Sequence, residues 1–179
     1  VPMYNALTAA LSESGRLTWF GEDMARRGSY VEPDPGAYFA QVKRAWQLSE
    51  RELARLQTLC RWRENAARYF DMPRNRIVWD DHLMNLATLQ QVGAAELNEL
   101  LPKAIARKYG NAMLDAHAKG NAAEPPKPLN KPLSTGQTAR VKVLRSVAEE
   151  KAEQLGIAPE LLARRKDVEA CLRHYVENA

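Results

Sequence analysis

The stretch from Leu53 to Leu89 constrains the fold of this chain more than any other part of the sequence. In its first half, apolar residues recur at spacings of three and four, which is the period of one face of an α-helix. Met72-Pro73 is expected to end that helix, because the residue before a proline avoids the helical conformation. A second helix follows, with Asp80 or Asp81 as its cap and leucines spaced by three. The stretch therefore predicts a helical hairpin with an apolar face.

Helical spacing recurs along the rest of the chain. We expect helices over 3–12, 17–27, 38–46, 103–119, 137–155 and 166–176, and a short helical turn in AAELNELL before Pro102. Ser49 and Glu52 fit a capping box at the start of the long helix, and Gly120 fits the C-terminal cap of the helix over 103–119. No stretch alternates with the period of a β-strand, so the predicted fold class is all-α.

Two parts of the chain share one apolar pattern at an offset of about 85 residues. The matched pairs are Leu56 with Val141, Leu59 with Leu144, Trp62 with Val147, Ala67 with Ala152, Met72 with Ile157, Ile77 with Leu162, Leu83 with Val168, and Leu86 with Cys171. We interpret this as a duplicated domain, although two unrelated helical hairpins can share several such positions by chance. The second copy has no counterpart of AAELNELL or of the helix over 103–119, so we expect it to be incomplete, with an uncovered apolar face through which the fragment can self-associate.

These patterns predict five segments. Residues 1–30 form a helical tail, 31–48 a connecting segment, 49–121 the first small helical bundle, 122–136 a proline-rich linker, and 137–179 a truncated second bundle. The chain begins with Val1 rather than Met, so we expect it to be a piece of a longer protein.

Composition narrows the class of protein. A hydrophobic fraction of 45% and a charged fraction of 27% are typical of a soluble globular chain, and a net charge of +4 permits nucleic-acid binding without demonstrating it. There is no apolar run of the roughly 20 residues that span a bilayer and no signal peptide, so we expect a cytoplasmic protein without membrane contact. Cys60 and Cys171 lie on apolar helical stripes without the spacing of a zinc site, and we expect both to be reduced core residues.

Enzymatic motifs are absent from the sequence. It contains no GxGxxG, P-loop, GxSxG or HExxH motif, and its three histidines are far apart. His82 follows Asp80-Asp81, which could form a metal or acid–base cluster, but we favour the simpler role of these carboxylates at a helix start. We therefore predict neither catalytic nor metal-binding residues in the chain.

A basic and aromatic cluster is the pattern that indicates a ligand. The end of the long helix and its connector carry Arg61, Arg63, Arg68, Arg74 and Arg76, with Trp62, Tyr69 and Trp79 between them. Single-stranded nucleic acid binds to such mixtures through phosphate contacts and base stacking. The alternative is that Trp62 and Tyr69 lie in the core and the arginines pair with Glu64, Asp71, Asp80 and Asp81. Further candidates for phosphate contact are Lys103, Arg107 and Lys108 and, at the matching place in the second copy, Arg164 and Arg165.

The region around this cluster resembles the helicase-and-ribonuclease-D C-terminal (HRDC) domain, in particular the first such domain of bacterial ribonuclease D. The motifs that carry the resemblance are Arg61-Trp62-Arg63, Ala67-Arg68, Ile77-Val78, Asp81, Leu83 and the LNEL turn at 97–100. The segment from Gln137 to Tyr175 is similar to the second HRDC domain of that family, with its local match at 161–165, and residues 1–27 are similar to the helices that close the exonuclease domain.

The resemblance implies the C-terminal RNA-positioning part of a 3′-to-5′ exoribonuclease that trims tRNA precursors and other small structured RNAs. In that family a separate α/β domain holds two divalent metals, Mg²⁺ or Mn²⁺, on four acidic residues. The last family motif pairs a tyrosine with an aspartate four residues later, whereas Tyr4 is followed at that spacing by Thr8. We therefore expect no active site and no cofactor in this chain, so that the fragment is inactive. We also expect the parent protein to be monomeric.

Two alternatives remain. The bundles can instead be structural or protein-interaction modules, or the HRDC region of a RecQ-type helicase. The helicase is disfavoured because such enzymes usually carry one copy of the domain.

Overall fold

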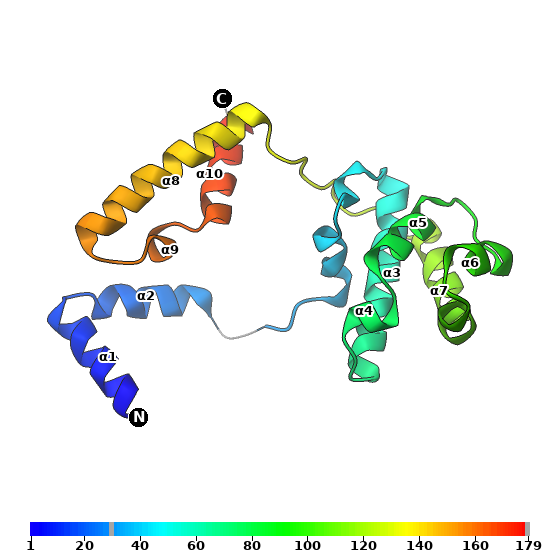
Figure 1. Cartoon of the computed structure of the whole chain (residues 1–179), viewed down its shortest axis with the longest axis horizontal. Helices are drawn as coiled ribbons and strands as arrows, with labels where there is room; N and C mark the ends of the chain where they lie inside the picture. The colour runs from blue at the N-terminus through cyan, green and yellow to red at the C-terminus, as the bar shows by residue number, and fades with distance from the viewer. Residues whose placement is uncertain (29–30, 178–179) are drawn as a thin grey trace.

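The computed structural model describes residues 1–28 and 31–177, and every regular element in these ranges is a helix. The elements are α1 (Pro2–Glu13), α2 (Leu17–Arg27), the 3₁₀ helices η1 (Pro35–Gln41) and η2 (Ala45–Gln47), α3 (Glu50–Tyr69), α4 (Arg74–Ile77), α5 (Asp80–Thr88), α6 (Ala94–Leu100), α7 (Lys103–Ala122), α8 (Thr135–Leu155), α9 (Pro159–Leu162) and α10 (Arg165–Glu177) (Figure 1). The all-α prediction is confirmed. Positions 29–30 and 178–179, which end two of the predicted segments, lie outside the described residues.

Helix α3 is the centre of the first helical unit, which extends from η1 to α7. It packs against α7, η1, α5 and α4. Leu53, Leu56 and Leu59 on its apolar face are almost completely buried, in one core with Leu83 of α5 and Met113 of α7. The predicted apolar stripe therefore does form a core.

Helices α3 and α7 run antiparallel at very short range. Tyr109, near the start of α7, meets Trp62 in the second half of α3, whereas Gly120, near the end of α7, lies against Arg55 in the first half. A Cβ atom added to Gly120 would lie 2.5 Å from the Arg55 Cα and 2.6 Å from the Thr58 Oγ1. The prediction that Gly120 caps the helix is wrong. The helix continues to Ala122, and the missing side chain allows the two backbones to approach.

The sequence signals at helix ends predicted some of the helix boundaries correctly and others not. The Ser49 N–H donates to the Glu52 Oε2 at 2.7 Å, which confirms the capping box of α3. The N-cap of α5 is Trp79, and Asp80 and Asp81 both lie in its first turn, so the predicted acidic cap is displaced by one position. The continuous helix expected over 38–46 is instead η1 and η2, separated by Arg44 in the left-handed conformation with φ of 67°.

The second helical unit, α8 to α10, repeats the helix pattern of the first. Helices α8, α9 and α10 begin at Thr135, Pro159 and Arg165, each 85 positions after the start of α3, α4 and α5. Its core is much smaller, with Val141, Val168 and Leu172 as the buried apolar residues. The shared pattern therefore produces the same hairpin but not the same packing.

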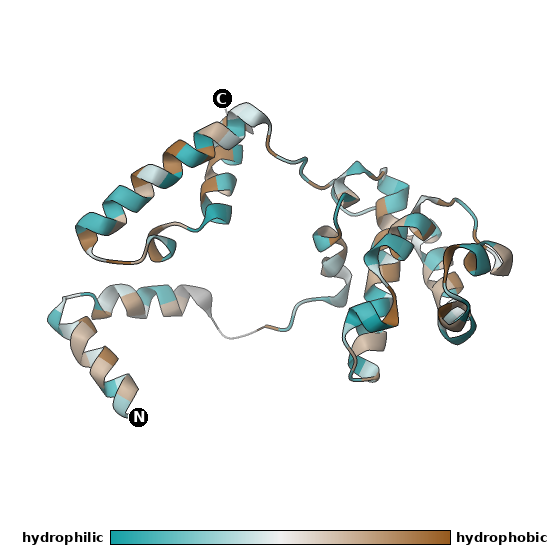
Figure 2. Cartoon of the chain, viewed as in Figure 1, coloured by the Kyte–Doolittle hydropathy of each residue, from teal (hydrophilic) through white to brown (hydrophobic). Residues whose placement is uncertain are grey.

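An apolar groove runs between α8 and α10, where hydrophobic residues recur along both helices (Figure 2). It is lined by Ala139, Arg140, Val143, Leu144, Cys171, Leu172 and Tyr175. Each of these lies 85 positions after a residue of the first unit: Ala54, Arg55, Thr58, Leu59, Leu86, Ala87 and Gln90. In the first unit, α7 packs on α3 at Arg55 and Thr58, so the groove corresponds to the surface of the first unit that α7 covers.

No described helix covers the corresponding surface of the second unit, and the expectation that Cys171 is a core residue is therefore wrong. Cys60 is buried, as predicted, but Cys171 is exposed. The apolar pattern marked Cys171 as a core position because its counterpart, Leu86, is one. Cys171 instead lines the apolar groove between α8 and α10, which no described helix covers.

Helix α2 lies beside the second unit, and α1 extends away from it (Figure 1). The Arg16 guanidinium donates a hydrogen bond to the Leu155 carbonyl at the end of α8. Helix α1 has no buried residue and leaves Met3, Tyr4 and Leu7 exposed. Within residues 1–28 and 31–177, none of the helices combines the length and hydropathy of a membrane span.

Candidate nucleic-acid interface

Arg63 is the most deeply buried of the ten predicted contact residues, with 1% of its surface exposed. Its Nη1 donates to the Val78 carbonyl at 3.1 Å and to the Asp80 Oδ1 at 2.6 Å, and its Nε lies 4.0 Å from the Glu64 Oε1. A buried cation needs such partners to offset its lost hydration. Arg63 therefore joins α3 to the start of α5 and cannot reach a phosphate, so its assignment to the interface is wrong.

Three further arginines hold the segment before α3 against the bundle. Arg61 pairs with Asp34 at 3.1 Å, and Arg68 pairs with Glu32 at 3.1 Å. Arg74 lies over the Tyr38 ring, 5.0 Å from its centroid, and also pairs with Glu64 at 3.4 Å. These partners come from residues 32–38 and not only from the acids beside the cluster.

The electrostatics of this segment follow from those contacts. The backbone N–H of Gly36 and, secondarily, Arg61 hold the pKa of Asp34 below its ordinary value. Of the four predicted acidic partners, Glu64 and Asp80 do pair with the cluster, whereas Asp81 approaches Arg44 at 3.9 Å. Exposed pairs of this kind are weak, so Arg61 and Arg68 could exchange a carboxylate for a phosphate.

The remaining first-unit candidates are exposed cations. The guanidinium groups of Arg76 and Arg107 and the ammonium group of Lys103 have no hydrogen bond or ion pair to any residue in the described part of the chain. Lys108 Nζ lies 5.0 Å from the centroid of Phe70 and 4.9 Å from that of Tyr109. Because α7 runs antiparallel to α3, the start of α7 brings Lys108 beside the end of α3.

The predicted aromatic residues divide between core and surface. Trp62 is partly buried and packs edge-on against Tyr109, with ring centroids 5.9 Å apart. Tyr69 is 84% exposed and Trp79 is 60% exposed. The alternative interpretation was therefore correct for Trp62 and wrong for Tyr69. The sequence-based candidates also omitted Phe70, an aromatic residue that is 43% exposed at the end of α3.

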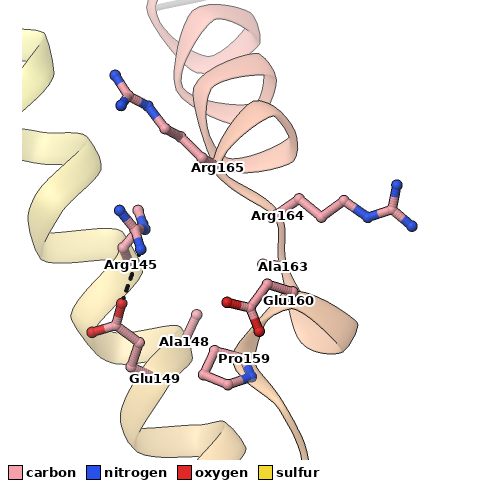
Figure 3. A pocket seen from close by; sticks show the side chains of 8 residues that line it. All are labelled: Arg145, Ala148, Glu149, Pro159, Glu160, Ala163, Arg164 and Arg165. Carbon is pink, nitrogen blue, oxygen red and sulfur yellow. Dashed lines mark hydrogen bonds and ion pairs between the residues drawn. The ribbon is translucent and has the colours of Figure 1, made fainter.

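In the second unit, Arg164 and Arg165 border a hollow between α8 and α9 (Figure 3). Arg164 points away from the hollow, and Arg165 pairs with Glu169 at 2.7 Å. Arg145 and Glu149 face each other across a 3.2 Å ion pair on α8, and the Glu160 carboxylate points inward. The mixture of charges gives the hollow no preference for an anion.

The lining of this hollow matches the surroundings of Arg63 in the first unit. All eight lining residues lie 85 positions after residues around that buried ion pair, with Ala148 in place of Arg63 and Arg165 in place of Asp80. The hollow is the space that a long buried side chain fills in the first unit. The basic residues of the second unit, Arg164 and Arg165, are therefore not structural equivalents of the basic residues of the first unit.

Two titratable groups, His117 and Cys60, are buried in the first unit. The Nε2–H of His117 donates to the Leu89 carbonyl at 2.9 Å, and burial lowers the pKa of the ring. Burial also raises the pKa of the Cys60 thiol to about 12. Across residues 1–28 and 31–177, histidine, cysteine and carboxylate side chains form no group of three that could hold a metal ion.

Comparison with known proteins shows what this chain is similar to. The HRDC domain family matches residues 52–116, which include most of α3, all of α4 to α6 and most of α7. Ribonuclease D of Pseudomonas paraeruginosa is 35% identical over 96% of this chain, and that of Xanthomonas oryzae is 33% identical over 95%. The crystal structure of Escherichia coli RNase D, described as an exoribonuclease involved in structured RNA processing, superposes over 98% of this chain with a TM-score of 0.76 and 28% identity.

The matched region is only part of those proteins. This chain covers 47% of the Pseudomonas relative, 48% of the Xanthomonas relative and 49% of the Escherichia coli chain. It therefore spans about half the length of the curated relatives that it matches.

Proposed function

We propose that this chain binds RNA. In support, its residues 52–116 match the HRDC domain family, and ribonuclease D proteins are similar to it over about half of their own length. The observation that carries the proposal is the set of exposed cations on the first unit, Arg76, Lys103, Arg107 and Lys108, together with the exposed ring of Tyr69. Cations without an ion-pair partner can neutralise phosphates at little cost, because no existing pair has to break.

In the complete protein, this binding would hold RNA for a 3′-to-5′ exoribonuclease. The proposed substrates are tRNA precursors and other small structured RNAs, and the proposed location is the cytoplasm. Divalent metal, Mg²⁺ or Mn²⁺, would belong to a catalytic domain in the part of the relatives that this chain does not match. The names of the relatives support a ribonuclease over a RecQ-type helicase.

The test measures, by fluorescence anisotropy, the binding of a fluorescein-labelled single-stranded RNA of about 12 nucleotides. The salt concentration is varied from about 50 to 300 mM, the range over which binding dominated by phosphate contacts changes strongly. The test variant changes Arg76, Lys103, Arg107 and Lys108 to alanine. We expect a log–log salt slope of about −3 for four contacts on a single strand, which the variant should bring close to zero.

The control variant changes Lys119, Lys127, Lys131 and Lys142 to alanine, which removes the same charge from exposed positions elsewhere. It should retain most of the affinity and of the slope. Equal losses in both variants would indicate a diffuse effect of net charge, and wild-type affinity in the test variant would refute the assignment of these four residues. Absence of exonuclease activity in this chain is a separate expectation, checked with a 3′-labelled RNA and Mn²⁺.

A second candidate function, association with another copy, is favoured by the α8–α10 groove. Helix α8 carries Arg140, Lys142 and Arg145 in its first two-thirds, whereas near its end three acidic residues, Glu149, Glu150 and Glu153, outnumber Lys151. An antiparallel copy of α8 would set the basic part of one chain against the acidic part of the other, in the relative direction that α7 takes on α3. We propose this pairing for the chain itself. Analytical ultracentrifugation should then show a dimer that Val143→Glu dissociates and that Leu161→Glu, an exposed change outside the groove, leaves intact.

A further inference from the structure

A continuous series of aromatic contacts connects the core of the first unit to its surface. Trp62 meets Tyr109 with ring centroids 5.9 Å apart and an interplanar angle of 69°. Tyr109 meets Phe70 at 6.2 Å and 59°, and Phe70 meets Tyr69 at 4.9 Å and 85°. The first and third of these pairs are edge-to-face and the second is tilted, and aromatic pairs that are not stacked face to face are attractive and orient both rings. The outermost ring, Tyr69, is therefore supported from the core rather than hanging free.

Tyr69 is nevertheless 84% exposed, more than any other aromatic residue in the described part of the chain. Its contact with Phe70 is at about a right angle, so the contact does not stack another ring onto Tyr69. An oriented ring that remains in water contributes little to the core. It provides a flat apolar surface with a defined position.

Positive charge accompanies this surface. The Lys108 Nζ lies 5.0 Å from the centroid of Phe70, the ring that supports Tyr69. Arg107 precedes it on α7 and is exposed. The pairing of a flat ring with nearby cations is the combination used for single strands, in which the ring takes a base and the cations take the backbone.

We propose that the Tyr69 ring is a base-stacking platform for an unpaired nucleotide of RNA, and that Lys108 contacts the phosphate beside that nucleotide. The inference rests on the proposed function and adds the class of RNA: single-stranded, because in a duplex the faces of the bases are already stacked. Since every base has a π-face, the platform accepts all four bases.

The experiment compares Tyr69→Ala and Tyr69→Phe with the wild type, using a 12-nucleotide single strand and a duplex of the same sequence, a length on the order of one binding site. Tyr4→Ala is the matched control, because Tyr4 is 70% exposed on α1 and has no ring contact among the described residues. We expect Tyr69→Ala to weaken binding of the single strand about 10-fold at an unchanged salt slope, because stacking releases no counterions. Tyr69→Phe and Tyr4→Ala should bind like the wild type, and binding of the duplex should not change with Tyr69→Ala.

The outcomes separate this inference from the proposed function. If the wild type binds the single strand with a salt slope but Tyr69→Ala binds equally well, the platform is refuted and RNA binding stands. If Tyr69→Phe loses as much affinity as Tyr69→Ala, the hydroxyl and not the ring face is responsible, and the platform is again refuted. If the wild type binds no RNA, the proposed function itself fails. Circular dichroism melting of Tyr69→Ala should match the wild type, since the exposed ring buries little surface.

Discussion

Replacing Gly120 with alanine should destabilise the first unit, although the same change normally favours a helix. Gly120 lies inside α7, where it faces α3. The added Cβ would be 2.5 Å from the Arg55 Cα, 3.0 Å from the Arg55 N and 2.6 Å from the Thr58 Oγ1. Two of these three atoms are backbone, so a side-chain rotation cannot relieve the contact. The two helices must separate.

The expected magnitude is the difference between two opposing effects. Alanine is favoured over glycine in a helix by about 1 kcal/mol. Overpacking typically costs about 1–3 kcal/mol and reaches the upper part of that range or more when backbones must move. A shift of about 1 Å in α7 would also loosen the contacts of Met113 and Tyr109 with α3. We expect a net loss of about 2 kcal/mol, which lowers the Tm of a unit of this size by about 10 °C.

The measurement is urea unfolding followed by circular dichroism, with Gly110→Ala as the matched control. Gly110 lies on the same helix and is also buried, but its added Cβ would meet only the Leu97 Cδ1, at an ordinary 3.6 Å. Gly110→Ala should therefore be neutral or stabilising by up to about 1 kcal/mol. Equal effects of the two substitutions, or a Gly120→Ala protein as stable as the wild type, would refute the close-approach argument.

Three further predictions concern buried polar groups and thiols. In the native state, one thiol, that of Cys171, should react quickly with an aromatic disulfide reagent, whereas Cys60 should react only on unfolding, because burial raises its pKa to about 12. Burial lowers the pKa of His117 below its value in the unfolded chain, so the unfolded state binds more protons than the folded state just below about pH 6.5. The free energy of unfolding should therefore fall as the pH is lowered from about 7.5 to 5.5. The fall should be smaller in His117→Gln, which lacks the titrating ring. Arg63→Met should lower the free energy of unfolding by about 3 kcal/mol, because it leaves Asp80 and the Val78 carbonyl without their partner, whereas the exposed Arg61→Met should cost less than about 1 kcal/mol in the same denaturation assay.

The features that were predictable from sequence are those written in local spacing. Apolar residues three and four apart identified α3, and Ser49 with Glu52 identified its start, because both signals act within one or two helical turns. The offset of about 85 residues between the two apolar patterns likewise anticipated that α8, α9 and α10 begin where α3, α4 and α5 would place them. Periodicity needs no knowledge of the partner that covers the face.

The fate of the arginines could not be obtained in this way, because it depends on partners that are distant in sequence. Arg61 and Arg68 find Asp34 and Glu32, roughly 30 positions earlier, in a segment that looked like an exposed connector. Arg63 turns inward because Val78 and Asp80 are brought beneath it by the turn through α4. No property of the residue type distinguishes this buried arginine from its exposed neighbours.

The same reasoning limits how far the two units can be compared with each other. Their helices begin in register, yet the second unit has Ala148 where the first has Arg63, and Arg165 where the first has Asp80. The first unit therefore has a buried arginine, Arg63, at this place, whereas in the second unit Arg165 lies at the rim of a hollow. A basic residue in one unit consequently predicts nothing about its counterpart, since one joins two helices and the other borders an empty space. Because Arg164 and Arg165 have no counterpart among the exposed first-unit cations, RNA contact in the second unit must be tested by its own variants.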